Sequence, residues 1–181
     1  VKLGSIHVLD QKQSSDDESS TKTTALLYWL EGRPQEGGRN VLCRYNSDAT
    51  TTTNQQDVSP TDVNVRTRVH EYGGGAVTLS PNSAPLIVNF ATQQLCRLVP
   101  NKEDDDGDAQ TSSLMSCEPI TADDNRFRFA DGVLDEKTGT LYCVREDHLH
   151  PEPKHVVNEI VAVDTQTGDM TVVATGNDFY A

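Results

Sequence analysis

The sequence contains no apolar run of the roughly 20 residues that a transmembrane helix requires, and no signal-peptide pattern follows Val1. We therefore expect a soluble, cytoplasmic protein without a membrane partner. Positive charge is also scarce, because 15 Lys and Arg stand against 28 Asp and Glu, which gives a net charge of −13. DNA, RNA and anionic membranes would repel such a surface, so we predict no nucleic-acid partner. The chain begins with Val rather than Met, and we expect the natural protein to be longer.

Cysteine is sparse and lacks the spacing of a metal site. The four cysteines lie far apart: Cys43, Cys96, Cys117 and Cys143. No C-x-x-C pair occurs, which excludes a zinc ribbon and a thioredoxin-like motif. Three of them, Cys43, Cys96 and Cys143, lie within apolar runs, where a free cysteine behaves as a small hydrophobic residue. We predict reduced, buried thiols.

Three of the few histidines lie close together in the sequence, at His148, His150 and His155. The first two would point to the same side of an extended chain, where they could approach a metal ion. The neighbouring Pro151 and Pro153 favour an exposed loop instead. We therefore predict no metal site and no cofactor.

Motifs for nucleophilic catalysis and for phosphate binding are missing as well. No G-x-S-x-G nucleophile elbow occurs, so this stretch has no recognisable serine nucleophile of the α/β-hydrolase type. The glycines at 73–75 lack the Lys and Ser or Thr of a P-loop. These observations predict that the segment itself is not catalytic.

Short apolar runs recur along the chain in a pattern typical of β-strands. They form three units of four runs each, with opening runs at 5–9, 74–79 and 129–134, second runs at 26–30, 86–90 and 141–145, third runs at 41–45, 94–98 and 159–164, and outer runs at 56–60, 118–121 and 170–174. No long stretch shows the apolar spacing of an amphipathic helix. The pattern predicts an all-β protein.

Repeated units of four short antiparallel strands are the signature of β-propeller blades. Two similar D-x-x-T-G turns, Asp135–Gly139 and Asp164–Gly168, support tight connections between such strands. We predict a β-propeller with about three four-stranded blades of an incomplete ring; an all-β sandwich is the alternative fold. The predicted blades span residues 5–60, 74–121 and 129–176, and residues 177–181 would start the next blade.

Three polar segments interrupt these units, at residues 11–24, 46–56 and 102–116. Their Ser, Thr, Asp, Asn and Gln cannot bury enough apolar surface to order a loop, so we predict solvated insertions. Asp104–Gly107 superficially resembles a calcium loop, but the ligands required at both ends of such a loop are absent.

The segment that looks most functional runs from Asn64 to Gly75 and reads NVRTRVHEYGGG. In an extended chain Arg68, His70 and Tyr72 would lie on one side, and Glu71 on the other. The glycines that follow would allow close approach of another backbone. One polar and aromatic face is therefore expected here.

This segment resembles one in the propeller of the prolyl oligopeptidase family of serine peptidases, in the dipeptidyl-aminopeptidase and acylaminoacyl-peptidase-like branch. The resemblance continues through four further motifs: YWLEGRP at 28–34, RFADG at 128–132, VREDH at 144–148 and NEIVA at 158–162. Several motifs agree in the same order, so this chain is similar to the N-terminal part of such a propeller.

The resemblance implies a propeller that caps a C-terminal α/β-hydrolase domain with a Ser, Asp, His triad, none of which lies in this chain. The parent protein would be a serine peptidase that cleaves short peptides by acyl transfer. Its partners would be the peptide substrate and the covalently linked hydrolase domain, and oligomerisation is compatible with this arrangement. The propeller would exclude large folded substrates.

We predict that Arg68, His70, Glu71 and Tyr72 belong to the substrate channel or to the interface with the hydrolase domain. A second group, with Arg145 and Glu146, is predicted for the same role. A carboxylate could hold a peptide amine there, and an Arg could hold a carboxylate. The competing interpretation is that all these residues make buried hydrogen bonds and ion pairs between blades.

Two other functions fit the same strand pattern. One is a non-enzymatic β-propeller that serves as a protein-interaction module. The other is a metal-dependent propeller lactonase, which requires a central cluster of carboxylates and Asn that the sequence does not reveal. A G-x-S-x-G segment downstream of this chain would favour the peptidase.

Overall fold

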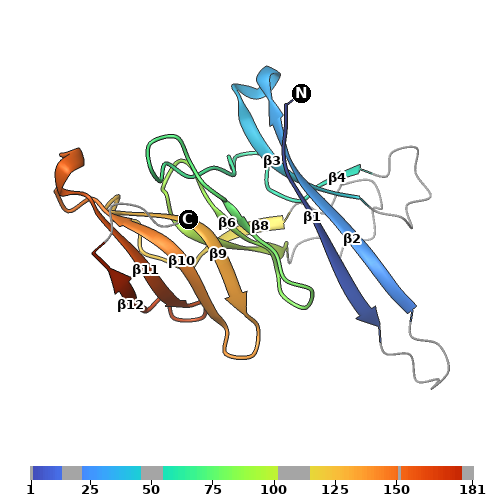
Figure 1. Cartoon of the computed structure of the whole chain (residues 1–181). Coiled ribbons are helices and arrows are strands. Elements are labelled where there is room, and N and C mark those ends of the chain that lie inside the picture. Colours follow the sequence, from blue (N-terminus) through green and yellow to red (C-terminus); the bar gives the residue numbers. More distant parts are fainter. Residues whose placement is uncertain (1, 14–21, 46–54, 102–114, 151, 177–181) are drawn as a thin grey trace.

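A computed structural model describes residues 2–13, 22–45, 55–101, 115–150 and 152–176 of the chain. These residues form three antiparallel sheets of four strands each, with the strands adjacent in space in the order of the sequence. The second sheet lies between the first and the third (Figure 1). The predicted all-β fold of three four-stranded units is confirmed, and the sheets form an open arrangement rather than a closed ring.

The strands follow one another as simple meanders. The first sheet contains β1 (Lys2–Gln13), β2 (Lys22–Arg33), β3 (Arg39–Tyr45) and β4 (Gln55–Asp57). The second contains β5 (Val77–Thr78), β6 (Leu86–Val88), β7 (Leu95–Pro100) and β8 (Met115–Pro119). The third contains β9 (Phe127–Asp135), β10 (Thr140–Asp147), β11 (Val157–Asp164) and β12 (Met170–Thr175).

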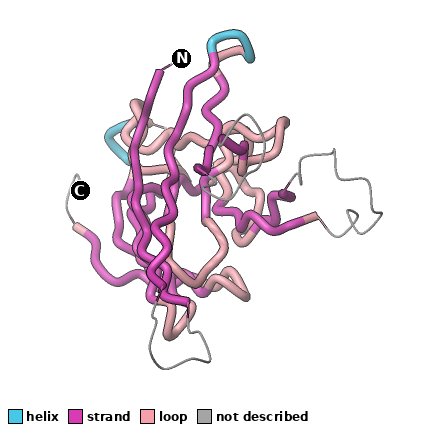
Figure 2. The backbone as a smooth tube through the Cα atoms, turned by 90° about the vertical axis from the view of Figure 1, so that its right-hand side faces the viewer, coloured by secondary structure: helices cyan, strands magenta, loops and turns pink. Residues whose placement is uncertain are grey.

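Helical structure in the described residues is limited to two single 3₁₀ turns, Pro34–Glu36 and Pro153–His155 (Figure 2). Both have Pro at their start, where the missing N–H costs no intrahelical hydrogen bond. No helix of the described part is long and apolar enough to cross a membrane.

The core is a continuous apolar cluster that joins all three sheets. Leu42 of the first sheet, Leu98 of the second and Leu141 of the third are fully buried members of it. Each lies in one of the apolar runs noted in the sequence, and alternation in the strand directs its side chain between sheets. Burying one such leucine contributes roughly 1.5–3 kcal/mol.

A connecting segment holds the first two sheets together by backbone hydrogen bonds. The Val65 N–H donates to the Asn40 carbonyl of the first sheet at 2.9 Å, and the Arg66 N–H donates to the Val88 carbonyl of the second at 3.1 Å. The Phe90 N–H donates to Asn64 O at 2.9 Å. Residues 64–66, which read NVR, therefore connect the first and second sheets by backbone hydrogen bonds, and this explains why apolar residues occupy alternate positions there.

The polar insertions are shorter than the sequence predicts, because strands extend into both ends of the first and into one end of each of the others. In the first, Gln11 pairs with Thr24 and Gln13 with Lys22, because β1 and β2 continue as a ladder into the polar region. Likewise, Gln55 and Met115 already belong to β4 and β8. Those parts of the loop prediction are wrong, since backbone pairing extends the strands whatever the polarity of the side chains. Residues 14–21, 46–54 and 102–114, and the expected start of a next blade at 177–181, lie outside the described residues.

The cysteines are free thiols, and Cys43, Cys96 and Cys143 are buried as predicted, with Cys117 partly exposed. Burial disfavours the thiolate and raises the pKa of Cys43 to about 11. The same effect raises the pKa of Cys143 to about 12. These thiols act as small apolar core residues rather than nucleophiles.

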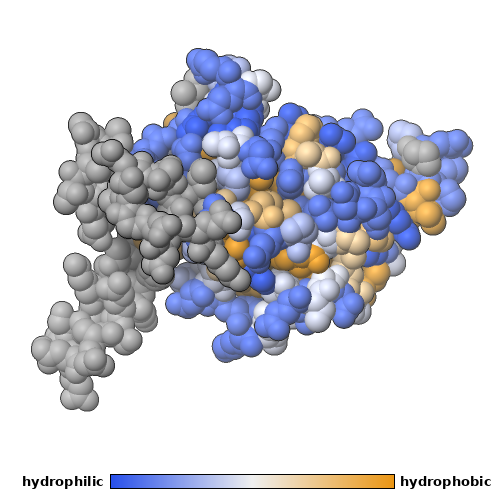
Figure 3. All heavy atoms as spheres, turned by 180° about the vertical axis from the view of Figure 1, so that it is seen from behind, coloured by the Kyte–Doolittle hydropathy of each residue, from blue (hydrophilic) through white to orange (hydrophobic). Residues whose placement is uncertain are grey.

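The outer faces of the first and third sheets carry exposed apolar side chains. Ile6 and Val8 on β1 are each 64% exposed, and Val133 on β9 is 69% exposed. Apolar patches also lie among the polar side chains on the face in Figure 3. An open array of sheets with uncovered end faces and free strand edges is prone to associate.

We expect the 181-residue chain on its own to self-associate rather than remain monomeric at micromolar concentration. Analytical ultracentrifugation over a concentration series measures this. The double substitution Ile6→Lys and Val8→Lys places charge on one outer face and should shift the distribution toward monomer. A wild-type chain that stays monomeric and melts cooperatively would contradict the expectation.

Candidate functional site

The predicted extended path of the functional segment ends at Val69, where the backbone turns. His70 and Glu71 adopt left-handed conformations, with φ of 54° and 62°. The Glu71 N–H donates to Arg68 O and the Gly73 N–H to Val69 O, both at 2.9 Å. The expected alternation of side chains beyond this point is wrong, because the chain turns here, and the turn also makes a tertiary contact that sequence spacing does not contain.

That contact is made by Glu146, a buried residue near the end of β10. Its Oε1 accepts the His70 backbone N–H at 2.7 Å and lies 3.1 Å from His70 Nδ1. Its Oε2 lies 2.9 Å from His148 Nε2 and 3.9 Å from Arg128 Nη1. The Glu146 side chain is only 5% exposed. One carboxylate therefore fixes a turn that is 76 residues away in the sequence.

Arg128 adds a second link between the same elements. Its Nη1 donates to the Arg68 carbonyl at 3.2 Å, and it lies opposite Glu146 in the register of β9 and β10. Because the guanidinium is close to both the turn and the carboxylate, it offsets part of the cost of burying a negative charge.

An open cleft of about 500 Å³ lies beside this turn. It brings together four predicted site residues, His70, Glu71, Tyr72 and Glu146, and five that the sequence analysis did not select as site residues, His148, Pro153, Lys154, Val156 and Asn158. Two of these five residues, His148 and Asn158, could have been predicted from their positions relative to Glu146. His148 follows Glu146 by two positions in an extended chain, and Asn158 lies opposite Glu146 in the ladder of β10 and β11.

The groups around the cleft differ in how free they are to contact a ligand. Glu146 is already engaged by His70 and His148, so its carboxylate acts as an anchor. Glu71 is exposed at the rim, and Tyr72 is 77% exposed with its ring 5.9 Å from the ring of His70. The cleft therefore offers a carboxylate and an aromatic face, which suit a ligand with a cationic or N–H donor group.

The other two predicted site residues lie outside the cleft. The Arg68 guanidinium stacks over the Phe90 ring at 4.4 Å from its centroid. Arg145 lies on the opposite face of β10 from Glu146, where its Nε donates to Glu159 Oε2 at 2.9 Å and its guanidinium covers the Phe127 ring. Strand alternation separates Arg145 from Glu146, so the structure does not bring this pair together.

The glycines after the turn pack directly on the third sheet. The Gly75 N–H donates to Asp131 Oδ1 and the Asp131 N–H donates to Gly75 O, at 2.7 and 2.8 Å. A Cβ on Gly74 would lie 2.9 Å from the Ala130 Cβ. Close backbone approach, one of the roles expected for these glycines, is what the structure shows.

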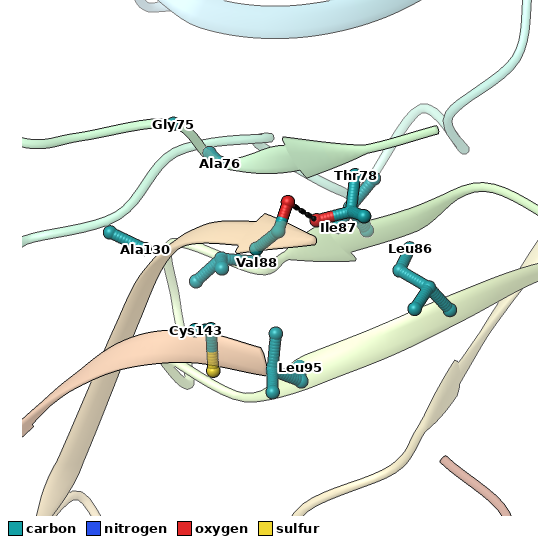
Figure 4. Close-up of a pocket in the computed structure, with 10 residues that line it drawn as sticks. Gly75, Ala76, Thr78, Leu86, Ile87, Val88, Leu95, Ala130 and Cys143 are labelled. Carbon is teal, nitrogen blue, oxygen red and sulfur yellow. Dashed lines mark hydrogen bonds between the residues drawn. The ribbon is translucent and has the colours of Figure 1, made fainter. Parts of the chain in front are cut away.

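This contact between the second and third sheets is tightly packed (Figure 4). The cavity within it measures only about 10 Å³, the size of a single water at most. Thr78 Oγ1 donates to the Gly132 carbonyl at 3.1 Å across the same contact. It is an inter-sheet interface and has no room for a ligand.

An ion pair next to the cleft gives a pH-dependent contribution to stability. The Arg126 guanidinium lowers the pKa of Asp147, whose Oδ1 lies 2.7 Å from Arg126 Nε. Because the folded pKa lies below its ordinary value near 3.8, this stability is fully present above about pH 4 and is lost as the pH falls through the folded pKa.

We expect wild type to lose more stability than Asp147→Asn between pH 6 and pH 3. The difference should be small, because the Arg126 side chain is exposed and solvent screens the pair. Urea unfolding at a series of pH values measures it. Parallel pH profiles for the two proteins would contradict the expectation.

Within the described part of the chain, no three His, Cys, Asp or Glu side chains are arranged to hold a metal ion. The side chains of His150 and His155 do meet, with their ring centroids 6.0 Å apart, and His155 Nδ1 lies 3.4 Å from a Glu152 carboxylate oxygen. These groups are exposed at the tip of the loop between β10 and β11.

Three solved structures share the arrangement of sheets. A variant of puromycin hydrolase in complex with PGG matches 83% of this chain with a TM-score of 0.66 and 24% identity. Puromycin hydrolase itself matches the same share with a TM-score of 0.65 and 23% identity. A puromycin-hydrolyzing peptidase from Mycobacterium tuberculosis matches 97% of this chain with a TM-score of 0.64 and 24% identity.

The chain is a β-propeller segment. The similarity spans nearly all of the described sheets, and it excludes the sandwich alternative. The propeller segment covers 23–25% of the length of the three matched structures. No protein-family model and no curated protein matches this sequence.

Proposed function

We propose that the chain is the N-terminal propeller portion of a serine peptidase of the prolyl oligopeptidase family, which hydrolyses short peptides. The observation that carries this proposal is the match of the propeller segment to structures of puromycin hydrolase and of a puromycin-hydrolyzing peptidase. The ordered series of motifs, from YWLEGRP to NEIVA, supports it independently. The triad would lie in a hydrolase domain linked to this segment.

Within that enzyme, we propose that the cleft beside the 69–73 turn contacts the substrate or the hydrolase domain. Glu71 and Tyr72 present their side chains at its rim, while the buried Glu146 carboxylate accepts the His70 N–H of the turn. A peptide N-terminal amine would pair with the Glu71 carboxylate, and an apolar side chain would pack on Tyr72. This favours a dipeptidyl-peptidase-like preference for free amines over an acylaminoacyl-like preference.

The complete reading frame provides the first test. A downstream G-x-S-x-G segment, followed in chain order by Asp and His, is expected. Its absence would leave the non-enzymatic interaction module as the better function.

Kinetics of the complete enzyme provide the second test, with peptide p-nitroanilides that have either a free or an acetylated N-terminus. Glu71→Gln should lower kcat/KM for the free-amine substrate about tenfold and leave the acetylated substrate within about twofold, as expected for the loss of one charge-assisted hydrogen bond. An equal change for both substrates would contradict the role of Glu71. The matched variant Glu118→Gln alters another exposed glutamate outside the cleft and should change neither.

A further inference from the structure

A second pocket, of about 230 Å³, opens between the first and second sheets, and none of its described lining residues lines the cleft beside Glu146. Its apolar walls come from both sheets and their connections: Val58, Pro85, Pro100 and Met115. Among the described residues that line it, the hydrogen-bonding ones, Tyr28, Arg44, Gln56 and Asp57, all belong to the first sheet. The pocket therefore combines an apolar enclosure with one polar side.

Three of these residues, Tyr28, Arg44 and Gln56, form a single row across the sheet. Tyr28 on β2 pairs in register with Arg44 on β3, and Arg44 pairs with Gln56 on β4. Residues paired directly opposite one another share a face of the sheet, and all three line the pocket. A phenol, a guanidinium and a carboxamide can each donate a hydrogen bond.

Arg44 lacks an anionic partner among the residues the structure describes. Its Nη2 donates to Gln56 Oε1 at 2.6 Å, and its Nε is buried with no acceptor in the described part of the chain. The pocket does contain one acid, Asp57, but both of its oxygens are held by Arg33 at 2.6 Å each. An unsatisfied buried donor on a cation is costly unless an acceptor completes it.

Because its Oε1 accepts from Arg44, Gln56 presents its amide NH₂ as a further donor. The polar side of the pocket thus has an excess of donors and one positive charge that no described carboxylate neutralises. In a chain with a net charge of −13, this is an unusual local environment. It suits a carboxylate, which accepts several hydrogen bonds and matches the guanidinium fork.

We propose that this pocket binds a carboxylate carried on a small apolar body. The carboxylate would pair with Arg44 and accept from Tyr28 or Gln56, and the apolar body would pack against Pro85, Pro100 and their neighbours. A volume of about 230 Å³ accommodates a ligand the size of benzoate or of a single terminal amino acid. This site is independent of the peptidase assignment and of the Glu71 cleft.

The test is a ligand-observed NMR titration of the protein expressed from its complete reading frame. Benzoate is the anionic probe, and methyl benzoate is a neutral control of similar shape. We expect benzoate to bind with a Kd of about 1 mM or below, as befits a small ligand with one charge-assisted contact, and the ester to bind at least tenfold more weakly.

Arg44→Gln should weaken benzoate binding at least tenfold, since it removes the charge-assisted hydrogen bonds. Arg66→Gln removes the same charge from an exposed residue that stacks on Phe90 outside the pocket, and it should change the Kd less than twofold. If Arg44→Gln fails to fold, Arg44→Lys keeps the charge, and it should weaken binding less than tenfold because only the fork is lost.

Such a carboxylate has two possible sources, a peptide C-terminus and a free carboxylic acid. N-acetylvaline, with its C-terminal amide as the neutral control, distinguishes them. Tighter binding of N-acetylvaline than of benzoate would assign the pocket to a peptide C-terminus, and the reverse order would assign it to a free carboxylic acid; either result supports the site. Equal binding of benzoate and its ester, or equal binding by wild type and Arg44→Gln, would overturn the proposal.

Discussion

Glu146→Ala is expected to destabilise the 69–73 turn by about 3 kcal/mol, because it removes the buried carboxylate that accepts the His70 backbone N–H and contacts the imidazoles of His70 and His148. By the usual relation of tenfold per 1.4 kcal/mol, the amide of His70 should exchange with solvent roughly 100-fold faster. Hydrogen exchange of the peptide that covers residues 64–75, in the complete protein, measures this.

Two matched variants make the result specific. Glu146→Gln keeps one carbonyl oxygen as an acceptor and should accelerate exchange less than Glu146→Ala does. Glu71→Gln changes the neighbouring exposed carboxylate and should stay within about 0.5 kcal/mol of wild type. Unchanged exchange in Glu146→Ala would show that the turn forms without the carboxylate.

Gly168→Ala is expected to lower the free energy of unfolding by about 3 kcal/mol or more, while Gly139→Ala costs only about 1–2 kcal/mol. Both glycines close D-x-x-T-G turns and have positive φ, 77° and 70°. The difference lies in what surrounds them. A Cβ on Gly168 would overlap the carbonyl oxygen of Ile120, which follows β8 of the second sheet, whereas a Cβ on Gly139 has its nearest neighbour, Thr165 Oγ1, at 3.7 Å.

Thermal unfolding by circular dichroism compares the two glycine variants under one set of conditions. The expected order of melting temperatures is wild type, then Gly139→Ala, then Gly168→Ala. Substituting the glycine of the same turn motif is thus expected to lower the free energy of unfolding by different amounts, because only Gly168 lies against the end of a neighbouring sheet. Equal losses for both variants would show that left-handed backbone conformation alone sets the cost.

The cleft illustrates which parts of a site could be predicted from the sequence. Polar and aromatic residues followed by glycines predict a site from Arg68 to Tyr72, and the structure places His70, Glu71 and Tyr72 at one cleft. Their predicted orientation is wrong, since the backbone turns there and the His70 N–H donates to Glu146, on a strand 76 residues later. Arg145 and Glu146 are predicted as one group, but strand alternation places the two on opposite faces of β10.

By itself the sequence determined the class of fold, because alternating apolar runs and D-x-x-T-G turns encode strands and hairpins locally. It also determined the burial of Cys43, Cys96 and Cys143, since each lies in an apolar run. Only the tertiary structure decided that Glu146 accepts the His70 N–H of the turn, that Asp131 accepts the Gly75 N–H, and that Arg44 has no described carboxylate partner. Each of these depends on how separate sheets pack, and side chains from distant strands meet only after that packing has fixed the distances between them.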